Sequence, residues 1–275
     1  MEEPLRPGMV RLRVHGRPSV GTRDIVDATV FARKLAILIQ AIRAATSVYN
    51  RRAAFDYAIV GLRRGSATVE VEEIPRRPSM IQASGVEAFE LCVNAVYEGN
   101  FERARGFGRC PEYLEKLSRG ANEQFGYGEL WINGHTLVRV DSFLQDQGRA
   151  AMGLPPKVAA PEEPNWFRGI ARSSFVGQIL EADFRGALPQ GKLILAAGGR
   201  EIDCVFRDID VEELRNYLKG PRVRVEGRAI YDGKFGLPRR VEVSLITPLI
   251  ATGDFARWKG SFDPFDVPAW EESDL

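Results

Sequence analysis

The chain has 275 residues, of which 44% are hydrophobic and 27% charged, and its formal net charge is +1. This is the composition of an ordinary folded protein, and no apolar run approaches the roughly 20 residues of a membrane-spanning helix. Its three cysteines, with no C-x-x-C pair, exclude a disulfide framework and a cysteine-rich zinc site.

Residues 1–152 are predicted to form an α+β domain in which helices cover a largely antiparallel sheet. Alternating apolar residues predict a strand from Val10 to Val14, and a helical apolar face follows a capping residue, Asp27. The remaining predicted elements are strands over 55–62 and 66–74, a capped helix from Ser84, a short helix after Pro111, and two strands flanking Asn133-Gly134. Asn-Gly predicts a two-residue hairpin turn, because both residues tolerate positive φ.

No catalytic or metal-binding constellation is predicted, and no cofactor is expected. His15 alternates with strand arginines and is interpreted as solvent-facing, while His135 follows the hairpin turn. Cys92 and Cys204 are interpreted as core residues. Cys110 stands at a helix start, where the dipole could lower its pKa, although packing is the favoured interpretation.

A proline-rich linker is predicted over 153–168, because four prolines fall within the ten residues 155–164 and the segment has little to bury. The linker separates the first domain from residues 169–250. The pieces on either side are each long enough to bury a core of their own.

The second domain shows the element order β-β-β-α-β-β. Strands are predicted over 174–184, 192–197, 201–206, 222–230 and 240–246, with a helix capped by Asp210 between the third and fourth. In order and size this part resembles an OB-fold. The resemblance implies a small five-stranded barrel whose ligand face is bordered by the loops after the first and fourth strands.

Cations gather near the end of this barrel. In the predicted fourth strand Val223 and Val225 face inward, so the arginines between them share the exterior. Exposed cations can neutralise phosphates while an aromatic ring stacks on a base, the usual combination for single-stranded nucleic acid. The candidate nucleic-acid-binding residues are Arg222, Arg224, Arg228, Tyr231, Lys234, Phe235, Arg239 and Arg240.

The last segment, 251–275, is an acidic aromatic tail. Its final fifteen residues contain five acids (Asp263, Asp266, Glu271, Glu272 and Asp274) and no base. In general character it resembles the acidic tails of bacterial single-strand-binding proteins, although it lacks their terminal proline–phenylalanine. Phe262, Phe265 and Trp270 are candidate partner-binding residues; a strap over the barrel and a solubilising terminus stay open as alternatives.

These patterns predict a non-catalytic, bacterial-type cytosolic accessory protein that contacts nucleic acid through the basic edge of the barrel. The alternative is a regulatory or antitoxin-like subunit that holds a protein partner through the N-terminal sheet or the tail. A metal-dependent enzyme acting on nucleic acid is the third hypothesis, and it lacks a ligand motif.

Overall fold

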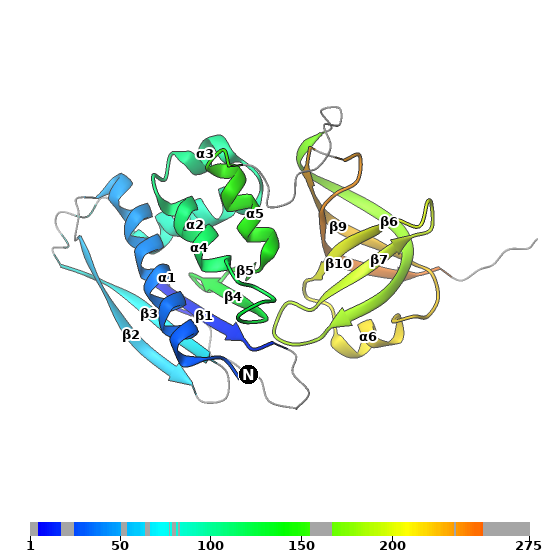
Figure 1. Ribbon diagram of the computed structural model, residues 1–275, viewed down its shortest axis with the longest axis horizontal. Helices are drawn as coiled ribbons and strands as arrows, with labels where there is room; N and C mark the ends of the chain where they lie inside the picture. Colours follow the sequence, from blue (N-terminus) through cyan, green and yellow to red (C-terminus); the bar gives the residue numbers. More distant parts are fainter. Residues whose placement is uncertain are drawn as a thin grey trace, which may run out of the picture.

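The computed structural model describes residues 5–17, 25–50, 54–63, 67–76, 78, 81, 83–154, 167–233 and 235–249. An N-terminal domain of helices and strands lies beside a C-terminal barrel (Figure 1). The predicted α+β class is confirmed. Residues 155–166 of the predicted linker and residues 250–275, including Phe262, Phe265 and Trp270, lie outside the described residues.

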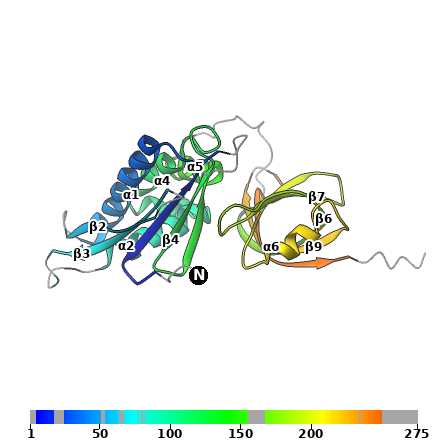
Figure 2. The ribbon, with the colours of Figure 1, turned by 90° about the horizontal axis from the view of Figure 1, so that it is seen from below.

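The N-terminal domain is built on one antiparallel sheet with the strand order β2-β3-β1-β4-β5. Its strands are β1 (Met9–His15), β2 (Phe55–Arg63), β3 (Ala67–Pro75), β4 (Tyr127–Ile132) and β5 (Thr136–Val140). Its helices are α1 (Ala28–Tyr49), α2 (Gly85–Tyr97), α3 (Phe101–Arg105), α4 (Cys110–Ser118) and α5 (Ser142–Ala151). The helices lie on one face of the sheet (Figure 2).

Local chemistry sets the limits of several elements as predicted. The Asp27 side chain accepts hydrogen bonds from the first backbone N–H groups of α1, and the Ser84 hydroxyl accepts one from Glu87 at the start of α2. Asn133 and Gly134 both have positive φ, 53° and 79°, so the turn between β4 and β5 has the predicted geometry.

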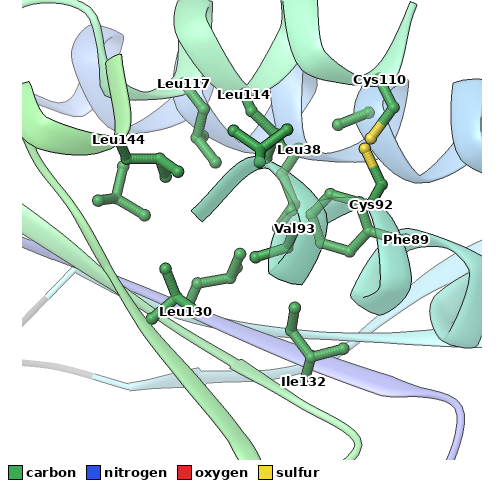
Figure 3. Close-up of a cluster of buried hydrophobic side chains, with 14 of the residues drawn as sticks. Leu38, Phe89, Cys92, Val93, Cys110, Leu114, Leu117, Leu130, Ile132 and Leu144 are labelled. Carbon is green, nitrogen blue, oxygen red and sulfur yellow. The ribbon is translucent and has the colours of Figure 1, made fainter. Parts of the chain in front are cut away.

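The core of this domain lies between the sheet and its helices. Apolar side chains of the strands alternate toward the helices, and they pack against residues such as Leu38, Phe89 and Leu114 (Figure 3). Cys92 and Cys110 bring their sulfur atoms toward each other within this core. Burial raises the pKa of the Cys110 thiol well above its usual value, so the helix dipole does not activate it.

The C-terminal domain is a closed barrel with the strand order β10-β8-β7-β6-β9. Its elements are β6 (Arg168–Asp183), β7 (Gln190–Leu195), β8 (Glu201–Phe206), α6 (Val211–Asn216), β9 (Val223–Asp232) and β10 (Arg240–Pro248). Among the described strands of the barrel, β8 and β10 pair in parallel and the other neighbours pair antiparallel. Val223, Val225 and Cys204 point into the barrel core, as predicted.

Three features differ from the sequence prediction. Helices α3 and α5 were not predicted, and β6 begins six residues before the strand expected from Ser174. None of the described helices is long and apolar enough to cross a bilayer. Helix α5 carries Asp146, which pairs with Arg239, and the added residues of β6 include Arg172.

Candidate functional site

The two domains meet across a buried ion pair. Arg240, on β10 of the barrel, is 1% exposed, and its guanidinium donates to the Asp141 carboxylate at 2.7 Å. The same guanidinium lies 4.1 Å from the centroid of the Phe143 ring. Burial alone would raise the pKa of Asp141, but the charges of Arg240 and Arg139 outweigh burial and hold that pKa below its usual value.

A second contact joins the loop between β6 and β7 to the N-terminal sheet. The Glu129 side chain is fully buried, and one carboxylate oxygen accepts hydrogen bonds from the backbone N–H groups of Ala187 and Leu188 at 2.6 and 3.2 Å. Arg139 donates to the Leu188 carbonyl at 2.9 Å, while the Tyr127 hydroxyl donates to the carbonyl of Arg185. This loop is therefore fixed against the first domain.

Three more arginines of the barrel reach across the boundary. Arg207 donates to the Leu137 carbonyl at 2.8 Å, and so satisfies a group at the outer edge of β5. Arg239 pairs with Asp146 of α5 at 2.5 Å. Arg228 lies 3.3 Å from Glu98, and it also pairs with Glu242 of its own barrel at 2.9 Å.

The structure therefore corrects part of the predicted nucleic-acid surface. Arg240 is buried, so the prediction that it contacts a ligand is wrong. Arg228 and Arg239 are occupied by carboxylates of the first domain. Tyr231 packs against the barrel core and the Phe167 ring, with centroids 5.4 Å apart.

The other predicted residues keep their place on the surface or lie outside the described part. Arg222, Arg224 and Phe235 are exposed, and Lys234 lies outside the described residues. Both loops that the OB-fold resemblance marked as the ligand edge contact the N-terminal domain, through Ala187 and Leu188 in one and Arg239 in the other. A ligand of this barrel therefore needs another face.

An outer face with free cations does exist. Arg172 on β6 and Arg224 on β9 are exposed, and Arg222 directly precedes β9. Arg224 pairs in register with Val176, four residues along β6 from Arg172, which separates the two arginines by about 13 Å along the strands. None of these three, the outer arginine strip, has an ion pair with a described residue.

Sequence reasoning missed Arg172 because it began the first barrel strand at Ser174. The available signal for a longer strand was weak, because Ser173 and Ser174 are both polar and interrupt the alternation of apolar and polar residues. The same reasoning misplaced His15. It is 4% exposed, stacks on Tyr127 with ring centroids 4.3 Å apart and lies 3.2 Å from Glu129, so it is a buried interface residue.

Neither metal-ligand chemistry in the described residues nor comparison with known proteins points to a function for this arrangement. Within the described residues, no group of three His, Cys, Asp or Glu side chains could hold a metal ion. No protein-family model matches the chain, and no curated protein matches it either.

Proposed function

We propose that the protein is a non-catalytic accessory protein that binds single-stranded nucleic acid on the outer face of β6 and β9. The observation that carries this proposal is the outer arginine strip, Arg172, Arg222 and Arg224, which is exposed and free of acidic partners among the described residues. Arginines in such a row neutralise phosphates without reading the bases. The element order of an OB-fold supports the proposal, although the ligand would lie outside that fold's usual loops.

Salt-dependent binding of a fluorescent oligonucleotide tests this proposal. A length of about 20 nucleotides is sufficient, because one barrel covers about 4–16 nucleotides. Replacing both Arg172 and Arg224 by alanine is expected to weaken binding at least about tenfold at low salt. The slope of log K against log salt should fall by about 1.4, since each lost phosphate contact in a single strand accounts for about 0.7.

Arg215→Ala is the matched control. Arg215 is an exposed arginine of the same barrel, on α6, but it is paired with Glu212 at 2.6 Å. Its removal should leave the affinity and the salt slope unchanged. Equal affinity of the double variant and the unaltered protein would rule out the outer arginine strip as the nucleic-acid surface.

A second candidate function is supported by the free edge of the N-terminal sheet. Strand β2 ends the sheet, and no described strand pairs with its outer edge. Ile59 and Val60 on β2 are 50% and 47% exposed, and Ile74 on the neighbouring β3 is 46% exposed. An open, apolar edge favours addition of a strand from another protein, which fits a regulatory subunit.

Sedimentation velocity and co-purification from the source cells test this second function. Val60→Lys should abolish whichever assembly the unaltered protein forms, because a charge at an edge strand opposes pairing. Val48→Lys is the control, since Val48 is 44% exposed but lies on α1. A partner retained equally by both variants would contradict binding at the β2 edge.

A further inference from the structure

A basic cavity of about 680 Å³ lies in the N-terminal domain, over the outward face of α1. Gln40, Ala44 and Ser47 line it from α1, between residues of β2 on one side and of the start of α4 on the other. Ligand sites in proteins typically enclose about 300–1,000 Å³. The cavity is separate from the domain interface and from the outer arginine strip.

The charge of this cavity is positive. Arg43, Arg76 and Arg109 line it, and no described lining residue is acidic. Asp56 neutralises Arg76 at 2.5 Å, and Glu112 neutralises Arg109 at 2.8 Å. Arg43 has no carboxylate within 4 Å among the described residues, so its charge is available to an anion.

Aromatic rings stand on both sides of the same cavity. Tyr57 comes from β2 and Tyr113 from α4. The Arg43 guanidinium lies 5.7 Å from the Tyr57 ring centroid, and the Arg109 guanidinium lies 5.4 Å from that of Tyr113. Cations beside aromatic faces create a surface on which a flat, electron-rich ring with an attached anion can stack.

The Tyr57 ring is fixed in place rather than free to fill the cavity. Its hydroxyl lies 3.0 Å from the Thr46 hydroxyl, which itself donates to the Ile42 carbonyl at 2.7 Å. Tyr57 is therefore the donor in the first bond, because the single Thr46 proton is already used. Burial raises the pKa of Tyr57 to about 12, so the ring is a neutral phenol beside Arg43.

We propose that this cavity binds a nucleoside monophosphate. Arg43 would hold the phosphate, and Tyr57 and Tyr113 offer their rings to the base. Gln40 and Ser47 line the cavity as uncharged hydrogen-bonding groups for the sugar or the base, and Ser47 would act as an acceptor because its hydroxyl donates to the Ala44 carbonyl at 2.7 Å. The cavity volume suits a ligand of this size. The unneutralised Arg43 suits the phosphate, and the rings of Tyr57 and Tyr113 suit the base.

Isothermal titration calorimetry with AMP, GMP, CMP and UMP tests the site, with adenosine and inorganic phosphate as partial ligands. At least one mononucleotide should bind with 1:1 stoichiometry and a Kd below about 1 mM, equivalent to about −4 kcal/mol. Both partial ligands should bind at least about tenfold more weakly. Phosphate binding as tightly as the mononucleotide would overturn the assignment of ligand class.

Arg43→Gln should weaken mononucleotide binding at least about tenfold, and Tyr113→Leu should weaken it without removing a charge. Arg33→Gln is the control, because Arg33 is an exposed arginine of the same helix outside the cavity. Thermal melting of each variant confirms its folding. Equal affinity of Arg43→Gln and the unaltered protein, or no saturable binding of any mononucleotide, would overturn the proposal.

The outcome is independent of the proposed nucleic-acid surface. The variant lacking Arg172 and Arg224 should bind mononucleotides as the unaltered protein does, because both residues lie on the barrel. Conversely, Arg43→Gln should leave the salt slope of oligonucleotide binding unchanged if the outer arginine strip alone carries that function.

Discussion

Arg240 and Asp141 form a buried ion pair whose members come from different domains. Both side chains are at most 5% exposed. Removing one member leaves the other as an unpaired buried charge, which typically costs about 3–5 kcal/mol, whereas replacing both by apolar residues costs far less. The pair therefore specifies how the domains meet more than it adds to overall stability.

We predict that Asp141→Ala and Arg240→Met each lower the free energy of unfolding by about 3–5 kcal/mol. The double variant should lose less than the sum, because Arg240 no longer leaves an unpaired charge and only Arg139, 3.5 Å from Asp141, loses its carboxylate. Chemical denaturation of the four proteins measures this coupling. Strict additivity would show that the two residues do not stabilise each other.

The same pair predicts a pH dependence. The pKa of Asp141 is lower in the folded than in the unfolded state. Its contribution is therefore fully present above the unfolded pKa of about 3.9 and is lost as the pH falls through the folded value. Acid titration of stability should show a steep decline below about pH 4 that is shallower in Asp141→Asn.

The three cysteines should be unreactive in the folded protein. Cys92, Cys110 and Cys204 are fully buried, and burial raises the pKa of Cys204 to about 12. A thiol-specific chromogenic disulfide should label none of them at neutral pH within the lifetime of the native state, and all of them in denaturant. Rapid labelling of Cys110 in native buffer would contradict its buried position.

At the scale of elements, local rules found the hairpins and the helices capped by Asp27, Ser84 and Asp210 but missed α5, which Asp141 caps. This helix has only Phe143 and Leu144 as large apolar residues, and it contains Gly148, which weakens a helix in isolation. Gly148 is required by packing, because a Cβ there would lie 3.0–3.2 Å from the Cβ and backbone of Glu115 on α4. No local pattern reveals that contact.

Gly148→Val is therefore expected to destabilise the protein by about 1–3 kcal/mol, as overpacking does, despite the better helix propensity of valine. Thermal melting measures the loss. Gly153→Ala is a comparison in which a Cβ meets nothing within 4 Å and only the positive φ of 73° opposes the change. A Gly148→Val protein as stable as the original would show that α4 and α5 can move apart.

At the scale of the whole molecule, desolvated polar groups hold the domain boundary together with apolar contacts, since Ile170 and Ile230 of the barrel pack against the core of the first domain. Glu129 contacts the barrel through two backbone N–H groups, and Arg240 contacts the first domain through Asp141. Buried polar groups that satisfy one another must be broken together. We therefore expect the two domains to unfold as one cooperative unit.

Calorimetry should show a single unfolding transition for the unaltered protein. Glu129→Leu removes the acceptor of Ala187 and Leu188, so it should lower the midpoint and separate the transition into two. Arg215→Ala, on the surface of α6, should change neither. A single transition at an unchanged temperature in Glu129→Leu would show that this contact does not couple the domains.

The sequence by itself determined the elements whose cause is local. Alternation located β1 and β9, the capping residues Asp27, Ser84 and Asp210 located three helix starts, and Asn133-Gly134 located a turn, because each depends on neighbours a few residues away. Only the tertiary structure decided which arginines stay exposed. Arg228, Arg239 and Arg240 meet carboxylates from about 90 to 130 residues earlier in the chain, and charge in a sequence does not reveal such distant partners.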